Sequence, residues 1–200
     1  MRLLGLDKNC FSSWWKTLPG GTTMVVQPKI EGCAIWLRYK YGQLVDAYSR
    51  ENPEIIEIIR TINTIPLSID DSLKVEVELE GVLYSPFLSS KLLKEHHKSN
   101  SVKQFANKKP LAFLAFQIFS SKSDELSDLT QLQEWGFEVP ITLRTDDPRQ
   151  VKFWHSQWLN YELFSDLPTN GIVAKCNSSS IKDFLGVSSS SPNWALALTR

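Results

Sequence analysis

Residues 26–39 have the sequence VQPKIEGCAIWLRY, in which two apolar runs flank a single lysine, Lys29. The pattern predicts one strand over residues 23–28, a tight break that carries Lys29, and a second strand over residues 33–39. Glu31 and Gly32 follow the lysine. A lysine between two buried strands is costly unless it is paired or used in chemistry. An ordinary hairpin-turn lysine is the simpler alternative, and this segment alone does not decide between the two.

Length and composition predict a soluble globular domain. The chain has 200 residues, 42% of them hydrophobic, and 22 basic residues balance 22 acidic ones. Without a global positive field, binding to nucleic acid would depend on a local patch or on a partner. The three cysteines are far apart and lack C-x-x-C spacing, which favours reduced thiols, a cytoplasmic location and no structural zinc. We expect neither a signal peptide nor a membrane-spanning segment.

Periodicity along the chain predicts interleaved helices and antiparallel strands, and therefore an α+β fold in one compact unit. Asn52, Ser123 and Asp147 are the expected N-caps. A stripe of Val151, Trp154, Trp158 and Leu159 is expected to be buried, and residues 110–119 to form a fully buried strand. Helices are expected near 7–18, 52–63, 124–135, 148–159 and 178–185, with further strands at 44–49, 73–83, 110–119, 139–143, 171–175 and 192–200.

Two lysines are the candidates for chemistry. Lys29 and Lys175 both adjoin buried strands, and each would disfavour the charged form of the other if they converged. A pyrophosphate or triphosphate between them would be stabilised by the same cations. Acids such as Glu31 and Glu80 could then orient the lysine, bind ribose hydroxyls or hold a divalent metal. An aromatic ring from residues 113–119 could stack on a base.

Two other features have plain structural alternatives. Glu76, Glu78 and Glu80 alternate with apolar residues on the 73–83 strand, so they form either a solvated face or a face that aims one carboxylate into a cationic site. His96 and His97 are adjacent and cannot share one face, which favours surface positions over a metal site. The sequence contains no P-loop, dinucleotide-binding glycine motif or nucleophile elbow.

These residues resemble the adenylation (nucleotidyltransferase) domain of bacterial NAD-dependent DNA ligases. Residues 28–39 are similar to its PKxDGxAxxLxY motif, which contains the AMP-accepting lysine. The resemblance continues in order over nearly the whole chain. The further partial matches are residues 4–8 (LSLD), 41–45 (NGxLV), 60–67 (RTIxxIPL), 75–80 (LEVRGEV), 109–116 (RPLxFFAY), 132–137 (LxxxGF), 170–175 (DGVVxK) and 185–197 (LGxTxxxPRWAxA).

The resemblance implies a ligase-type fold, with antiparallel sheets flanked by helices, and a covalent lysyl-AMP intermediate. It implies a helical lead-in over residues 1–22 and a nucleotidyltransferase core over residues 23–200. Lys29 would attack the α-phosphate of NAD or ATP with Mg²⁺ present, and nicked DNA or RNA would be the acceptor, with the help of other proteins. The implied roles are Lys175 for the phosphate, Glu80 (or Glu78) for the ribose, Phe116 for the adenine ring, and Gln27, Ile30, Glu31, Gly32 and Arg50 for further nucleotide contacts.

Several positions depart from the family pattern. Glu31 and Asn170 replace motif aspartates, and Gln27 replaces an acid expected near adenine. Residues 49–54 lack the glycines of the family's TRGDGxxGEDVT loop, and a glycine-rich segment after residues 105–107 is missing. Thr199 stands where a phosphate-binding lysine is expected, and Arg200 could replace that lysine only by a one-residue slip onto the other strand face.

Two hypotheses therefore remain from the sequence. The chain is a minimal nucleotidyltransferase that adenylates Lys29, or it is a catalytically degenerate ligase-like domain that acts as a nucleotide-binding or protein-interaction module. The nicotinamide-binding, OB-fold, zinc, helix-hairpin-helix and BRCT modules of the ligases have no counterpart in the sequence. Sealing of nicked DNA by this chain alone is thus the least expected activity.

Overall fold

The computed structural model describes residues 10–49, 55–70, 76–86, 110–119, 121–188 and 191–200. The chain divides into two compact units. The first unit comprises residues 1–30, 122–126 and 141–200, and the second comprises residues 31–121 and 127–140. Each unit is built around its own four-stranded antiparallel sheet, with helices alongside. The predicted α+β class is confirmed, but the prediction of one compact unit is wrong, because the strands form two separate sheets.

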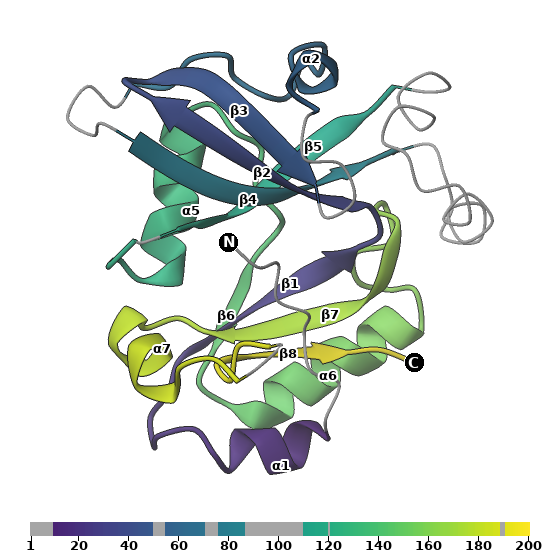
Figure 1. Cartoon of the computed structure of the whole chain (residues 1–200). Coiled ribbons are helices and arrows are strands. Elements are labelled where there is room, and N and C mark those ends of the chain that lie inside the picture. Colours follow the sequence, from purple (N-terminus) through teal and green to yellow (C-terminus); the bar gives the residue numbers. More distant parts are fainter. Residues whose placement is uncertain (1–9, 50–54, 71–75, 87–109, 120, 189–190) are drawn as a thin grey trace. The chain divides into compact units, whose positions relative to one another are not determined.

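The sheet of the first unit has the order β6-β1-β7-β8 (Figure 1). Its strands are β6 (Leu143–Thr145), β1 (Met24–Ile30), β7 (Thr169–Cys176) and β8 (Ala195–Leu198). Strand alternation sends one set of side chains into an apolar core, where helices α1 (Phe11–Trp15) and α6 (Pro148–Leu159) cover them. The core members are Phe11, Trp14, Met24, Val26, Val151, Trp158, Phe164, Ile172, Ala174, Leu196 and Leu198. The opposite face of this sheet carries polar side chains together with the buried Val25 and Val173.

Helix α6 begins as the sequence predicts. The Asp147 carboxylate accepts a hydrogen bond from the Arg149 backbone N–H at 2.8 Å, and proline occupies the first helical position. The predicted buried stripe is only partly right. Val151 and Trp158 are buried, whereas Leu159 is 36% exposed, because adjacent helical residues point about 100° apart and Trp158 already occupies the inward direction.

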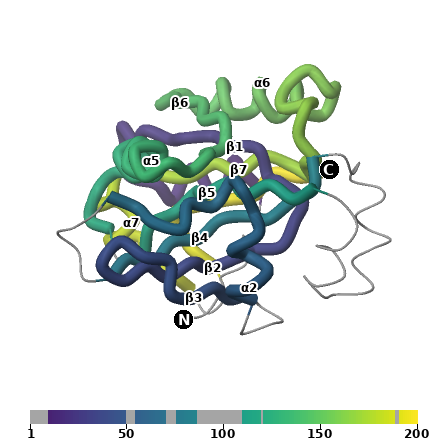
Figure 2. The backbone as a smooth tube through the Cα atoms, turned by 90° about the horizontal axis from the view of Figure 1, so that it is seen from above, coloured from purple at the N-terminus to yellow at the C-terminus, as the bar shows by residue number. Residues whose placement is uncertain are grey.

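The sheet of the second unit has the order β3-β2-β4-β5, and Figure 2 shows the four strands next to one another. They are β3 (Gln43–Ser49), β2 (Cys33–Lys40), β4 (Glu76–Tyr84) and β5 (Ala112–Ile118), with α2 (Ile56–Ile59) packed on β3. The predicted alternation of β4 is confirmed, since Val77 and Leu79 are buried while Glu76, Glu78 and Glu80 are not. Helix α5 (Glu125–Glu134) leads to Phe137, whose ring lies edge-on to Tyr39 at 6.1 Å.

Several element predictions are wrong in detail. The strand expected at residues 139–143 is reduced to the start of β6 at Leu143, and Pro140 has no N–H to contribute to a ladder. Helix α5 begins at Glu125, one residue after the predicted start, and Ser123 as its N-cap stays a prediction. β5 is not fully buried, because Ala112, Phe116 and Gln117 are only half-buried. β1 runs past Pro28 to Ile30, and β8 covers only part of residues 192–200.

Other predictions fall beyond the described residues. Asn52 as an N-cap, the histidine pair His96–His97 and Arg50 are among them. The described part of the 52–63 helix is α2, preceded by Ile55. Among the described residues, no helix is both long and apolar enough to cross a membrane.

Candidate functional site

Lys29 lies within β1 rather than in a turn. β1 pairs with β7 in antiparallel register, and the register shifts between Pro28 and Ile30, which flank the lysine. The half-buried Lys29 ammonium donates a hydrogen bond to the Asn170 side-chain carbonyl at 2.6 Å. The hairpin-turn alternative is therefore wrong. The nucleophile candidate is instead held by a neutral amide from the facing strand.

Gln27, Lys29 and Lys175 belong to the polar face of the first unit's sheet. Strand alternation places Gln27 and Lys29 opposite the face that carries Met24 and Val26. Lys175 pairs with Val25, four positions before Lys29. At about 3.3 Å per residue, the two lysines are therefore separated by about 13 Å along the strands. The sheet thus presents two cations on one face, at the two ends of a short polar row.

Gln27 is 3% exposed, and its side-chain amide donates to the Thr142 hydroxyl at 3.0 Å. Thr142 precedes β6, on the far side of β1 from β7. The amide is thus fixed in the sheet face beside Lys29. It supplies hydrogen bonding there without the negative charge that the family pattern has at this position.

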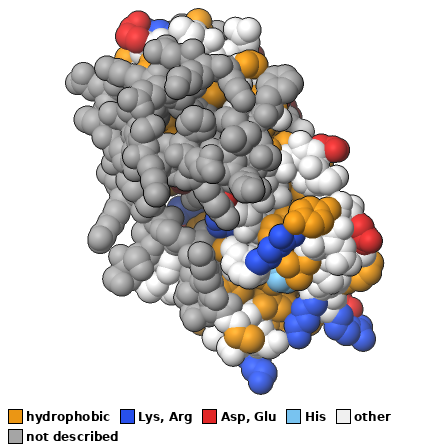
Figure 3. Space-filling model, turned by 90° about the vertical axis from the view of Figure 1, so that its right-hand side faces the viewer, with side chains coloured by type: hydrophobic (Ala, Val, Ile, Leu, Met, Phe, Trp, Pro, Cys, Tyr) orange, Lys and Arg blue, Asp and Glu red, His pale blue; other side chains and the backbone are white. Residues whose placement is uncertain are grey.

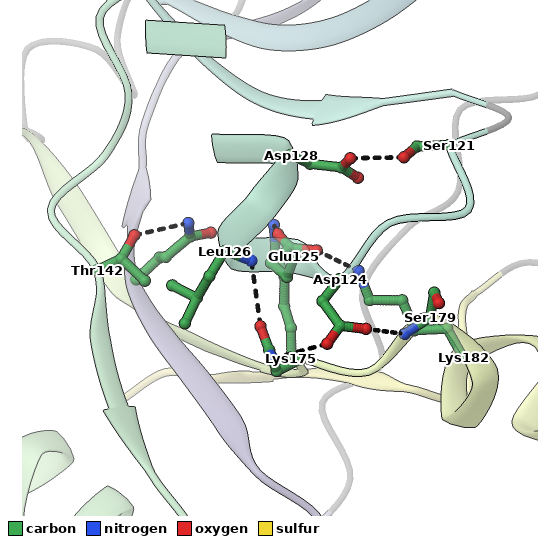
Figure 4. A network of polar contacts seen from close by, with 11 residues as sticks. Ser121, Asp124, Glu125, Leu126, Asp128, Thr142, Lys175, Ser179 and Lys182 are labelled. Atoms are coloured by element: carbon green, nitrogen blue, oxygen red, sulfur yellow. Dashed lines mark hydrogen bonds and ion pairs between the residues drawn. The ribbon is translucent and has the colours of Figure 1, made fainter. Parts of the chain in front are cut away.

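Lys175 is part of a buried charged cluster (Figure 4). Its ammonium donates to one oxygen of the Glu125 carboxylate at 2.6 Å, and Lys182 of α7 (Ser179–Leu185) contacts the other oxygen. The side chains of Glu125, Lys175 and Lys182 are 3%, 8% and 15% exposed. Burial alone would raise the pKa of the Glu125 carboxyl, but the two ammonium groups hold that pKa below its ordinary value.

An exchange of helix caps positions this cluster. Asn177, directly after β7, accepts hydrogen bonds from the backbone N–H of Glu125 and of Leu126, at 2.8 and 3.1 Å. In return, the Asp124 carboxylate accepts from the backbone N–H of Ser179, at 2.9 Å, at the start of α7. The first turn of each helix is therefore capped by a side chain that flanks the other helix: Asn177 caps α5 and Asp124 caps α7. The exchange fixes Glu125 and Lys182 on either side of the end of β7.

The sequence prediction missed Glu125 and Lys182. Glu125 follows the start of a helix and Lys182 lies 57 residues further on, so no local pattern connects them. The available signal was weak: Lys182 belongs to the helix expected directly after the Lys175 strand, whereas nothing in the sequence relates Glu125 to that strand. Only the folded arrangement brings the three charges together.

Thr199 follows β8 at the Lys29 end of the sheet. Ile172 pairs with Leu198, so Gly171 and Thr199 are the next neighbours along the two strands. A Cβ on Gly171 would lie 2.4 Å from the Leu198 carbonyl oxygen and 3.0 Å from Cγ2 of Thr199. Only glycine permits this close approach. The motif position that lacks its lysine therefore lies beside Gly171, the residue next to the Asn170 that binds Lys29.

Arg200 does not replace the missing lysine. Its guanidinium donates to the Leu159 carbonyl at 3.3 Å and lies over the rings of Trp158 and Tyr161, 5.4 and 4.7 Å from their centroids. Trp158 belongs to the apolar core face, so Arg200 has turned to the other side of the sheet, as strand alternation predicts. Figure 3 shows basic side chains bordering hydrophobic ones beside a histidine on one face of the molecule.

The second unit brings Glu80 and Phe116 together. Glu80 pairs with Trp36 on β2 and with Gln117 on β5. The register of β4 and β5 shifts immediately after Glu80, which leaves Phe116 at the irregularity, half-buried. Such bulges re-aim a side chain. The predicted ribose-binding and adenine-stacking residues are thus neighbours on one sheet.

Ile30, Glu31 and Gly32 mark the passage from one unit to the other. Ile30 is the last residue of β1, and Glu31 is 5% exposed. A Cβ on Gly32 would lie 2.3 Å from the Leu83 carbonyl oxygen. This contact explains physically why glycine follows the acid: β4 passes too close for any side chain.

The thiols do not supply a competing nucleophile at Lys175. Cys10, Cys33 and Cys176 are free. Burial raises the pKa of the Cys176 thiol to about 12, despite the opposing effect of Lys182. This neighbour of Lys175 therefore stays neutral over the physiological pH range.

Comparison with known proteins decides the family. Residues 11–115 match the model of the NAD-dependent DNA ligase adenylation domain. The chain belongs to this family. It is 26% identical over 204 residues to a DNA ligase of Halothermothrix orenii, covering 89% of this chain and 30% of the relative. A DNA ligase of a Psychrobacter species is 26% identical over 199 residues, covering 86% and 29%. The chain thus spans about a third of the length of these relatives.

Solved structures share the ligase-type fold. A structure from a study of Lig E DNA ligases aligns with a TM-score of 0.59 and 12% identity, covering all of this chain and 69% of the other. An RNA ligase of Naegleria gruberi with PPi aligns with a TM-score of 0.60 and 12% identity, covering all of this chain and 56% of the other. At this level of identity the likeness concerns the fold. The predicted nucleotidyltransferase fold is confirmed.

Proposed function

We propose that the chain is an adenylyltransferase domain that accepts AMP on Lys29. The observation that carries the proposal is the polar sheet face of the first unit, on which Lys29 and Lys175 stand at opposite ends of one row in a chain of the ligase adenylation family. A covalent acceptor and a separate phosphate-binding cation are the minimum that such a transfer requires.

The reaction would exchange one bond for another at the α-phosphorus. The neutral Lys29 amine attacks, a P–N bond forms, and the P–O bond to the leaving group breaks. Nicotinamide mononucleotide leaves if NAD is the donor, and pyrophosphate leaves if ATP is the donor. After the attack the nitrogen gives one proton to solvent and keeps the other. Because Asn170 is uncharged, it orients the nitrogen without adding a negative charge that would stabilise the protonated form.

The proposed roles of the remaining residues follow from their positions in the sequence motifs that resemble those of the family. We propose that Lys175 binds the donor phosphate, that Glu80 (or Glu78) binds the ribose and that Phe116 stacks on adenine. Further nucleotide contacts are proposed for Gln27, Ile30, Glu31, Gly32 and Arg50. Mg²⁺ would accompany the donor phosphates and share their charge. The AMP acceptor would be a nick or end in DNA or RNA during repair or replication in the cytoplasm, with sealing completed by other proteins.

Two donors need to be tested. The family description names NAD, and an archaeal RNA ligase with the same fold, with a TM-score of 0.60, is described as ATP-dependent. The protein is incubated with NAD or ATP labelled in the AMP moiety, in the presence of Mg²⁺. The expected result with one donor is label that stays on the denatured protein in alkali and is released by acid, as a P–N bond requires, and that is mapped to Lys29 by mass spectrometry.

Lys29→Arg is the sharpest control, because it keeps the positive charge but cannot attack at neutral pH. Lys152→Arg, at an exposed position of α6, is the matched control. We expect no label on Lys29→Arg and unchanged labelling of Lys152→Arg. Absence of label on the wild-type protein with both donors would reject the proposal.

A second candidate function is a nucleotide-binding or protein-interaction module without chemistry. The observations that favour it are Thr199 beside Gly171 and the turning of Arg200 onto Trp158 and Tyr161. Loss of one phosphate-contacting group commonly lowers a rate about a hundredfold or more. This candidate predicts saturable binding of adenine nucleotide without transfer of label to Lys29.

A further inference from the structure

Lys182 shares a buried carboxylate with Lys175, although no motif includes it. Glu125 accepts from Lys175 with one oxygen and from Lys182 with the other. The Lys182 ammonium also lies over the ring of Trp194, 5.0 Å from its centroid. Trp194 directly precedes β8, the strand that pairs with β7 next to Lys175. Lys182 therefore lies between Glu125 and Trp194, and its side chain is 15% exposed.

The charge of the cluster depends on Lys182. Glu125 and Lys175 alone would cancel, and an anionic phosphate would gain little from approaching a neutral pair. Lys182 leaves the three charges of the cluster with a net charge of plus one, while one Glu125 oxygen contacts each ammonium group. An ammonium has three donor hydrogens, so a contact with Glu125 does not exhaust the capacity of Lys182 to donate to a second anion.

We propose that Lys182 is a second phosphate-binding residue that acts beside Lys175 on the diphosphate of the AMP donor, with Glu125 as the residue that positions both lysines. The proposal rests on the proposed adenylyl transfer. Lys182 does not occupy the place of the missing motif lysine, since Thr199 lies at the Lys29 end of the sheet. It concentrates positive charge at the Lys175 end instead.

Inorganic pyrophosphate is the probe, because it carries the two linked phosphates that NAD and ATP have in common. Its dissociation constant is measured by calorimetry for the wild type, Lys182→Met and Lys182→Arg. Met keeps most of the stem over Trp194 and removes the charge, whereas Arg keeps the charge. We expect Lys182→Met to weaken binding about 10- to 100-fold, as for loss of a charged hydrogen bond, and Lys182→Arg to stay within about threefold of the wild type.

The control variant is Lys152→Met, which removes the same charge from the exposed face of α6. Thermal unfolding of each variant verifies that it is folded at the temperature of the binding experiment. Equal loss of affinity in Lys152→Met and Lys182→Met would attribute the effect to overall charge and overturn the proposal. So would equal loss in Lys182→Arg and Lys182→Met, or wild-type affinity in Lys182→Met.

Labelling of Lys29 separates this proposal from the one on which it rests. Pyrophosphate affinity that depends on Lys182 in a protein that is never labelled would support the binding site and reject the transfer. Normal labelling of the wild type and of Lys182→Met at donor concentrations below saturation would support the transfer and reject the role of Lys182.

Discussion

The two lysines of the polar sheet face have opposite partners. Lys29 is bonded to a neutral amide at 2.6 Å, and Lys175 is bonded to a buried carboxylate at the same distance. A nucleophile must lose its proton to react, and a phosphate-binding lysine must keep its proton. A neutral partner serves the first need and an anionic partner the second. The difference between Asn170 and Glu125 is therefore the one that the two proposed roles would require of Lys29 and Lys175.

Removal of the anionic partner has the largest expected effect. Glu125→Ala removes the buried carboxylate that both Lys175 and Lys182 contact, which should lower the free energy of unfolding by about 3–5 kcal/mol. Urea unfolding at neutral pH measures the change. Glu134→Ala, at an exposed position of α5, should remain within about 0.5 kcal/mol of the wild type. A similar small change in Glu125→Ala would show that the cluster is not a stabilising element.

The same carboxylate should make stability sensitive to acid. Its pKa is lowered in the folded state by Lys175 and Lys182, against the effect of burial. A group with a lowered folded-state pKa stabilises the fold above its unfolded pKa, ordinarily 4.5, and loses that contribution as the pH falls through the folded-state value. The free energy of unfolding of the wild type, measured from pH 7 downwards, should therefore begin to decrease once the pH is below about 4.5.

Glu125→Gln is the control for the acid series, because it cannot titrate. Its stability at pH 7 should be lower than that of the wild type, and the two curves should converge as the pH falls. Parallel curves would mean that other carboxyl groups account for the acid sensitivity.

A negative charge placed beside Lys29 would test whether its neutral partner, Asn170, affects the protonation of the lysine. Asn170→Asp gives Lys29 an anionic partner like that of Lys175, which favours the protonated amine. The pH dependence of Lys29 labelling should then move to higher pH by about one pH unit, with the plateau at high pH retained. Gln27→Glu introduces a negative charge on the same face with Thr142 as its neighbour and serves as the control for charge alone. An unmoved profile in Asn170→Asp would mean that the amide does not govern the protonation of Lys29.

Local patterns predicted the parts of the fold and site that depend on nearby residues. The alternation of residues 76–80 is a property of the strand itself, and the Lys29 and Lys175 motifs could be recognised where they stand. The Glu125 cluster could not be predicted in this way, because it requires that Asn177 and Asp124 exchange caps between two helices. The prediction of a strand at 139–143 was wrong because it gave more weight to the apolar residues than to Pro140, which cannot donate a hydrogen bond to a strand ladder.

Arg200 carries the smallest expected effect, and it bears on whether a third cation belongs to the polar face. Its guanidinium lies over Trp158 and Tyr161 on the core side of the sheet. A double-mutant cycle between Arg200→Ala and Tyr161→Leu should give a coupling energy of about 0.5–1 kcal/mol in unfolding experiments, typical of an exposed cation–π contact. Labelling of Lys29 in Arg200→Ala should equal that of the wild type. A large loss of labelling with no coupling to Tyr161 would instead indicate that Arg200 contacts the phosphate. Arg200 would then be an additional cation on the polar face, at the Lys29 end.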